Sequence, residues 1–285
     1  MRLLLVHGRS QGGKDSVKLK AEWLGALDEG LHKAGLKMPP SLDIDFPFYG
    51  DRLDEFVRQF ELPADPAIVP KGSPAFDEFA AFRAQVVLEM QIKAGITDAQ
   101  VQAERGPEPA EKGIQNWEWV QAIIRLLDRH ITGISQTTIE VFLRDVFLYT
   151  QRRVVKDAID KIVSEMLGPD TGVVVGHSLG SVVAYNVLKT APSKVPLYVT
   201  VGSPLGIRAI RKTLGPIANP AGRKGWYNAY DDHDVVALYP LDKINFDVAP
   251  AIVNNGLVHN WTENRHGIIG YLDDATVAKS IHSGF

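Results

Sequence analysis

The sequence predicts an α/β fold whose mostly parallel sheet is flanked by helices. Short apolar runs that end in glycine or proline alternate along the chain with longer segments of helical periodicity. These short runs are apolar at nearly every position, as is typical of parallel strands buried on both faces. The carboxyl ends of such strands meet at one edge of the sheet, where active residues are expected.

The N-terminal segments begin this alternation. Residues 2–6 predict a buried strand that stops at His7-Gly8. Apolar residues then recur every three or four positions from Ser16 to Ala34, which predicts a helix. Residues 42–48 predict the second strand. Because this first strand lies at the very start, we expect the sheet to lack any leading antiparallel strands.

Residues 51–140 are expected to form a helical cap inserted into a single domain that spans residues 1–285. This stretch has helical periodicity and polar loops but no strand pattern. Each predicted helix has an apolar face that needs a partner, so the insertion should pack on the carboxyl edge of the sheet. Its aromatic residues either form the insertion's own core or line a substrate pocket. The candidates for substrate contact are Phe79, Phe82, Trp117 and Trp119.

The C-terminal half continues the α/β pattern. Helical spacing runs through residues 141–167, and residues 172–176 then predict a buried strand. Further strands are predicted at residues 195–201 and 226–230. The chain after these strands reads as loops up to Asn264, and a closing helix is expected to begin near His266.

The most specific motif is Gly176-His177-Ser178-Leu179-Gly180, between the strand at 172–176 and a helical pattern. This is the G-x-S-x-G pattern of a nucleophile elbow, in which a sharp strand-to-helix turn exposes the serine Oγ to a base and a substrate. The small glycines allow the strand and the helix to approach closely. Ser178 is therefore the predicted nucleophile.

Chain order indicates the partners of Ser178, because the acid and then the base follow the nucleophile on a sheet that carries such an elbow. His266 is the predicted base, since an apolar helix follows it and would hold its ring, whereas His259 fits a structural or substrate-facing role. Asp234 is the predicted acid because the apolar run after it would pin its loop. Asp231 and Asp232 remain alternatives, since aspartate is also common in turns.

An oxyanion hole needs two backbone N–H donors. The residue after the nucleophile, Leu179, supplies one, and the loop after the first strand supplies the other from Arg9. The Arg9 side chain either has no part in catalysis or binds a carboxylate or phosphate of the substrate.

Together, His7-Gly8, residues 176–181, residues 228–234 and His266 with Tyr271-Leu272 resemble the α/β-hydrolase superfamily, especially its lipase-like and esterase-like bacterial members. The resemblance implies a catalytic triad of Ser178, His266 and Asp234 under a helical cap, without a cofactor. It therefore implies hydrolysis of a carboxylic ester through an acyl-enzyme. A thioesterase, an amidase or an acyltransferase would use the same triad. The cap would lie earlier in the chain than is usual in that superfamily.

A second class of function comes from Gly8 to Lys14, which nearly matches the phosphate-binding loop G-x-x-x-x-G-K-[ST] of nucleotide-binding proteins. Asp15 stands where that motif has a magnesium-binding hydroxyl, and its carboxylate would repel phosphates. The nucleotide-binding alternative is therefore the weaker one.

Composition limits the remaining classes. The net charge is −3 with both signs interspersed, which favours a small-molecule ester or acyl substrate over nucleic acid. The chain has no cysteine, and no histidine spacing is typical of a metal site, so we expect no metal. No apolar stretch is long enough for a signal peptide or a membrane span, so a cytoplasmic protein without integral membrane association is expected.

Overall fold

A six-stranded, entirely parallel sheet forms the centre of the protein. The structure is a computed structural model that describes residues 1–9, 11–60, 74–106, 117–130, 135–192 and 194–285. The strands are β1 (Arg2–Val6), β2 (Asp43–Asp45), β3 (Thr171–His177), β4 (Leu197–Val201), β5 (Gly225–Ala229) and β6 (Val253–Asn255). Five of them fall in the predicted segments. The sixth, β6, lies in a stretch where the sequence predicts only loops.

The strand order β2-β1-β3-β4-β5-β6 contains a switch point between β1 and β3. The chain moves from β1 outward to β2 on one side, and it returns to place β3 on the other side of β1. In open parallel sheets, ligands bind in the crevice outside the carboxyl ends of strands at such a point. The loop after β1 and the turn after β3 therefore border the predicted crevice.

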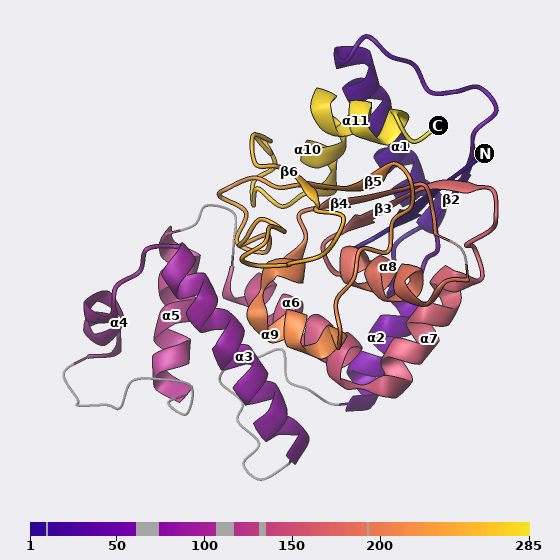
Figure 1. Ribbon diagram of the computed structural model, residues 1–285. Helices are drawn as coiled ribbons and strands as arrows, with labels where there is room; N and C mark the ends of the chain where they lie inside the picture. Colours follow the sequence, from indigo (N-terminus) through magenta and orange to yellow (C-terminus); the bar gives the residue numbers. More distant parts are fainter. Residues whose placement is uncertain (10, 61–73, 107–116, 131–134, 193) are drawn as a thin grey trace.

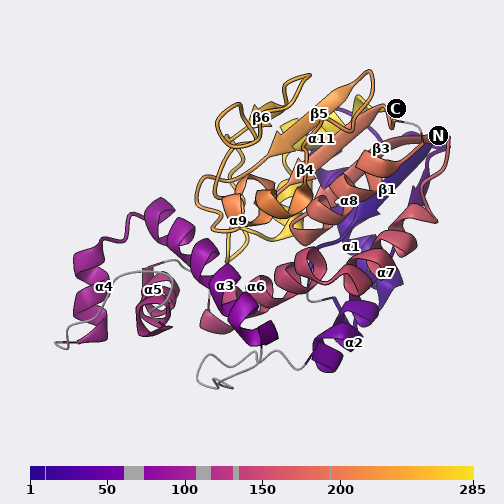
Figure 2. The same ribbon diagram turned by 60° about the horizontal axis from the view of Figure 1, so that its bottom comes forward.

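Alternate residues of the central strands supply two separate apolar cores. On β1, Leu3 and Leu5 face one layer of helices, while Leu4 and Val6 face the other. The first layer contains α1 (Ser16–Lys33), α10 (Ile268–Leu272) and α11 (Ala275–His282). The opposite layer contains α8 (Leu179–Thr190) and α7 (Arg153–Ser164), with α2 (Gly50–Phe60) and α6 (Gln136–Gln151) packed against α7 (Figures 1 and 2).

Three further helices stand to one side of this body. They are α3 (Pro74–Lys93), α4 (Asp98–Arg105) and α5 (Trp117–His130), as Figures 1 and 2 show. Helix α3 packs on α5 and α6, and a buried ion pair links Arg83 of α3 to Glu140 of α6. The Glu89 carboxylate on α3 also accepts hydrogen bonds from the first amides of a short helix, α9 (Arg208–Arg211).

These contacts divide the segment predicted as one insertion. Helix α2 packs against α6 and α7 over the sheet, whereas α3, α4 and α5 pack mainly on one another and on α6.

Two short 3₁₀ helices, Pro204–Gly206 and Lys212–Leu214, flank α9. Within the described ranges, no helix is both long and apolar enough to span a membrane.

Candidate active site

Ser178 lies in the turn between β3 and α8, with φ of 53° and ψ of −129°. This backbone conformation is costly for a residue with a side chain and persists only when the surroundings hold it. The Ser178 amide donates to the Val201 carbonyl of β4 at 3.2 Å, and the Ser181 hydroxyl donates to the Ser178 carbonyl at 2.6 Å. Ser178 therefore lies in a strained strand-to-helix turn that backbone and side-chain hydrogen bonds hold in place.

The motif glycines fit the close approach that such a turn requires. A Cβ atom at Gly180 would lie 2.2 Å from the His7 carbonyl oxygen, and one at Gly176 would lie 2.7 Å from the Ser181 Cα. Any larger residue would push α8 away from β1 and β3. Packing of backbone against backbone thus explains why the serine is flanked by glycines at these two positions.

The side chains of Ser178, His266 and Asp234 form a continuous hydrogen-bonded chain. His266 Nε2 lies 2.8 Å from Ser178 Oγ, and His266 Nδ1 lies 2.7 Å from Asp234 Oδ2. Because a carboxylate only accepts, Nδ1 carries the proton, and Nε2 is left to accept from the serine hydroxyl. The three predicted residues, which come from the β3–α8 turn, the loop after β5 and the loop before α10, thus meet at one place.

Asp234 is held by hydrogen bonds to both carboxylate oxygens. Oδ1 accepts from the amides of Val236 at 2.8 Å and Ala237 at 3.3 Å, and Oδ2 also accepts from the Tyr271 hydroxyl at 2.6 Å. Burial alone raises the pKa of Asp234, but His266 and these hydrogen bonds outweigh it and hold the pKa below the ordinary value. Asp234 therefore stays ionised beside His266.

The two alternative acids have other partners. Asp232 is exposed, and its carboxylate lies 2.6 Å from His233 Nδ1. Asp231 is buried and accepts from the amides of His233 and Asn260, each at 2.8 Å. Its amide donates to the Tyr271 hydroxyl. Asp231 therefore ties the loop that carries Asp234 to the segment that leads to His266.

Asp231, Asp232 and His233 also form, within the described residues, a group with ligand atoms close enough for a metal ion. The oxygens of Asp231 already accept the amide hydrogen bonds that shape the loop.

His259, the alternative base, is exposed on the segment after β6.

His177, inside the motif, holds the backbone of His266. Its Nε2 donates to the His266 carbonyl at 2.8 Å, and the two ring centroids are 4.8 Å apart. Burial lowers the pKa of His177 to about 3, so the ring is neutral at physiological pH. The sequence alone assigns no role to His177 or Tyr271, because neither motif nor spacing reveals which residues their polar atoms reach.

The loop after β1 lies directly against Ser178. A Cβ atom at Gly8 would lie only 2.9 Å from Ser178 Cβ. His7 holds this loop: its Nδ1 donates to the Gly8 carbonyl at 2.6 Å, and its Nε2 accepts from the Tyr49 amide at 3.1 Å. The predicted oxyanion donors, the amides of Arg9 and Leu179, thus belong to two segments that flank Ser178.

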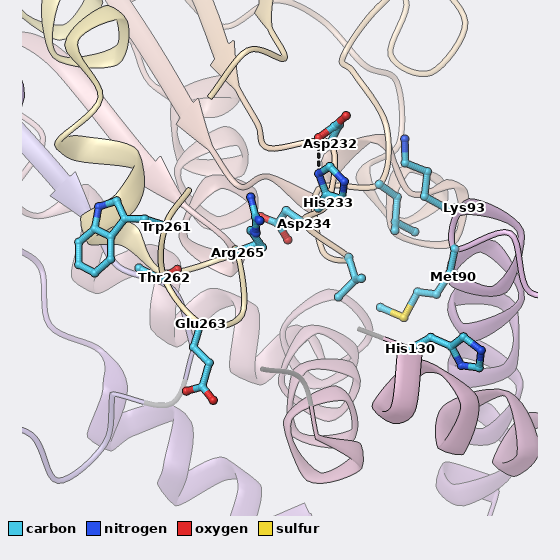
Figure 3. Close-up of a pocket in the computed structure, with 13 residues that line it drawn as sticks. Met90, Lys93, His130, Asp232, His233, Asp234, Trp261, Thr262, Glu263 and Arg265 are labelled. Atoms are coloured by element: carbon cyan, nitrogen blue, oxygen red, sulfur yellow. Dashed lines mark ion pairs between the residues drawn. The ribbon is translucent and has the colours of Figure 1, made fainter. Parts of the chain in front are cut away.

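Two cavities lie between the sheet edge and the neighbouring helices. The larger, of about 570 Å³, is bordered by Met90 and Lys93 of α3, by His130 at the end of α5, and by residues 232–235 and 261–263 with Arg265 (Figure 3). The smaller, of about 20 Å³, lies beside His266 and is lined by Arg9, Met90, Ile139 and Phe142 among others. Ser178 itself is only 1% exposed.

The four aromatic residues proposed for substrate contact line neither of these cavities. Phe79 and Phe82 are buried and pack on Phe147 of α6, with ring centroids 5.2 and 5.7 Å apart respectively. The Arg83 guanidinium carbon lies 4.1 Å from the centroid of the Trp117 ring, and Trp119 of α5 is buried. The described geometry places them in the packing between helices.

Two carboxylates from outside the segment Gly8 to Lys14 accept hydrogen bonds from amides at the start of α1, where a nucleotide would need these amides free. Asp15 caps α1, and its Oδ1 accepts from the amides of Val17 and Lys18 at 2.9 and 3.1 Å. The Gly13 amide donates to Asp51 Oδ1 at 2.7 Å. These negative charges disfavour a phosphate at this helix end.

Comparisons of the chain with known protein families, with curated proteins and with solved structures give no match. The functional interpretation therefore rests on the geometry around Ser178.

Proposed function

We propose that this protein is a serine hydrolase of the α/β-hydrolase type that cleaves a carboxylic ester through an acyl-enzyme. The observation that carries this proposal is the hydrogen-bonded chain from Ser178 through His266 to Asp234, built on a strained strand-to-helix turn. A serine hydroxyl becomes an effective nucleophile when an adjacent base takes its proton and a third group orients that base. No cofactor takes part in the proposed reaction.

In the proposed mechanism, Ser178 Oγ attacks the ester carbonyl while His266 Nε2 takes its proton. Asp234 stabilises the imidazolium that forms, and the amides of Arg9 and Leu179 donate to the oxyanion. His266 then returns the proton to the departing alkoxide, which leaves the acyl group on Ser178. Water, activated by the same His266, hydrolyses this acyl-enzyme and restores the free hydroxyl.

We further propose that α3 and α6 form part of a cap over this site. Met90 of α3 and Ile139 and Phe142 of α6 line the small cavity beside His266. Met90 and Val235 border both cavities, so they form the partition between the large cavity and the catalytic histidine. The flexible side chain of methionine is suited to move aside when a substrate enters.

Thioesters, amides and acyl acceptors other than water are compatible with the same triad. The nucleotide-binding alternative is disfavoured by the carboxylates of Asp15 and Asp51 at the start of α1. It would regain support if ATP with magnesium bound at micromolar concentrations and Lys14→Ala abolished that binding. A cytoplasmic, small-molecule enzyme remains our expectation.

The proposal is tested by labelling with a fluorophosphonate probe and by hydrolysis of p-nitrophenyl esters of increasing chain length. Ser178→Ala should abolish both, since removing a triad member typically lowers the rate by several orders of magnitude. His266→Ala should match it, whereas the exposed His259→Ala serves as the matched control and should retain labelling. Near-normal activity of Ser178→Ala, with a native circular dichroism spectrum, would refute the proposal.

A further inference from the structure

Two side chains form a clamp on Gly267, the residue directly after His266. The Gly267 amide donates to Thr262 Oγ1 at 2.9 Å, and the Gly267 carbonyl accepts from Asn260 Nδ2 at 2.8 Å. Gly267 also lies directly against Thr262, because a Cβ atom at this glycine would be only 2.6 Å from Thr262 Cγ2. Asn260 and Thr262 therefore fix the backbone immediately beyond the proposed base.

The two residues of this clamp are joined to each other. Asn260 Oδ1 accepts from the Thr262 amide at 3.1 Å and from the Thr262 hydroxyl at 2.5 Å. The first of these bonds closes an Asx turn, in which an asparagine side chain binds the backbone two residues further on. The Asn260 amide also donates to Asp231 Oδ2 at 2.8 Å. Asn260 thus connects the loop of His266 to the loop that carries Asp234.

The clamp accounts for a sequence pattern that has another common meaning. Asn260-Trp261-Thr262 matches N-x-[ST], the acceptor pattern of N-linked glycosylation. Asn260 is fully buried, however, and both polar atoms of its side chain have protein partners. The spacing of two residues instead allows the side chains of Asn260 and Thr262 to meet each other and Gly267.

The clamp also holds a strained backbone. Arg265, the residue before His266, has φ of 54°, in the left-handed region. This conformation is unfavourable for a residue with a side chain and persists only where surrounding contacts hold it. The Arg265 amide donates to the Thr262 carbonyl at 2.9 Å, so Thr262 binds the chain on both sides of His266. Without the clamp, we expect the loop to relax and the imidazole to turn away from Ser178 and Asp234.

Resting on the function proposed above, we propose that Asn260 and Thr262 are positioning residues that act through His266. They keep its imidazole between Ser178 Oγ and Asp234 Oδ2, at 2.8 and 2.7 Å respectively. Both distances are those of good hydrogen bonds, which weaken steeply when their angle is distorted. A displacement of about 1 Å caused far from the chemistry can lower a rate by about 100-fold. Loss of the clamp should therefore lower kcat.

Thr262→Val and Thr262→Ser form the matched pair for a kinetic test. Valine replaces the hydroxyl by a methyl group of similar size and loses its bonds to Gly267 and Asn260, whereas serine keeps the hydroxyl. For a short p-nitrophenyl ester, we expect Thr262→Val to lower kcat by roughly 10- to 100-fold with little change in KM. Thr262→Ser should restore kcat toward the wild-type value. Thr213→Val, which removes a half-buried hydroxyl bonded to the Ile210 carbonyl, is the control and should leave kcat unchanged.

Asn260→Asp tests the other half of the clamp. Aspartate keeps an acceptor for Thr262 but replaces the donor to the Gly267 carbonyl by an oxygen, so kcat should fall here too. If both residues had a merely structural role, the variants would lower the free energy of unfolding in urea and leave kcat unchanged. If the side chains touched the substrate, KM would rise instead. Either result would overturn the proposal.

Proton NMR separates this inference from the proposed function, because it needs no substrate. The Nδ1 proton of His266, bonded to the Asp234 carboxylate, should give a resonance far downfield of the amide region that Asp234→Asn abolishes. Thr262→Val and Asn260→Asp should shift or broaden this resonance, and Thr262→Ser should retain it. A resonance that depends on the clamp, without any ester hydrolysis, would refute the hydrolase and keep the positioning role. A resonance that both variants leave unchanged would overturn the positioning role even if the wild type hydrolyses esters.

Discussion

Two buried histidines should make this protein lose stability in mild acid. His7 and His177 are buried at the carboxyl ends of β1 and β3, and burial lowers the pKa of His7 to about 4 and that of His177 to about 3. Protonation would also break the bond in which His7 Nε2 accepts from the Tyr49 amide. Both rings therefore remain neutral in the folded protein at pH values where the unfolded chain is already protonated.

The magnitude follows from the difference between folded and unfolded pKa values. Because each folded pKa lies below the unfolded value of 6.5, the stability that each histidine contributes is present above pH 6.5 and is lost as the pH falls toward the folded pKa. Between pH 7 and pH 5 each histidine removes about 2 kcal/mol from the free energy of unfolding. Asp145 acts in the opposite direction, because its folded pKa of about 6 lies above the unfolded value of 3.8. Its protonation over the same pH range adds about 1 kcal/mol to the free energy of unfolding. The net loss from these three groups is about 2–3 kcal/mol, a substantial part of a typical domain stability.

His177→Gln isolates one of these contributions, because the glutamine amide can still donate to the His266 carbonyl. Urea unfolding followed by tryptophan fluorescence at pH 7 and pH 5 gives the loss of stability for each protein. We expect this loss to be about 2 kcal/mol smaller for His177→Gln than for the wild type. His259→Gln, which replaces an exposed imidazole, is the control. Equal losses for the wild type and His177→Gln would refute the reasoning, even if the variant were less stable at both pH values.

Two further predictions concern residues around the proposed triad and in the proposed cap. Tyr271→Phe removes the hydroxyl that donates to Asp234 Oδ2. The kcat for a short p-nitrophenyl ester should therefore fall by roughly tenfold, with little change in KM. An unchanged kcat would mean that Asp234 and His266 are held without this hydrogen bond. Phe79→Ala empties a buried position against Phe147 and should lower the free energy of unfolding by about 3–5 kcal/mol in urea titrations, without altering the preferred ester chain length. A shifted chain-length profile would instead place Phe79 in contact with the substrate.

The parallel sheet could be predicted because its central strands are marked by local signals. Residues 3–6 and 173–175 are apolar on both faces of the sheet and are followed by glycine-containing turns, so burial on both sides is visible in the sequence. Strand β6 lacks this mark because it is three residues long and includes Asn254 and Asn255. Its place in the sheet comes from backbone pairing with β5 and from the bond between the Asn228 and Asn254 side chains, which no hydrophobic pattern records.

The sequence also led to the three residues of the hydrogen-bonded chain, because each depends on chain order and a local pattern. Ser178 lies in the motif, Asp234 precedes an apolar run, and His266 precedes an apolar helix. The partners of Tyr271 and His177 could not be predicted in this way. The contact of Tyr271 with Asp234 and that of His177 with the His266 carbonyl join segments 37 and 89 residues apart. Only the folded arrangement brings these groups together.

Helix α3 shows why the cavity lining could not be predicted. Periodicity correctly marks one face of α3 as buried, and both Phe79 and Met90 lie on it. Eleven residues of helix separate them, which is about 16 Å along the axis. Phe79 packs on Phe147, whereas Met90 reaches the cavity beside His266. Because apolar residues recur at helical spacing toward both ends of α3, the sequence does not show which end meets the site. The position of α3 against α6 and α9 determines this, and the Glu89 carboxylate contributes by accepting hydrogen bonds from the first amides of α9.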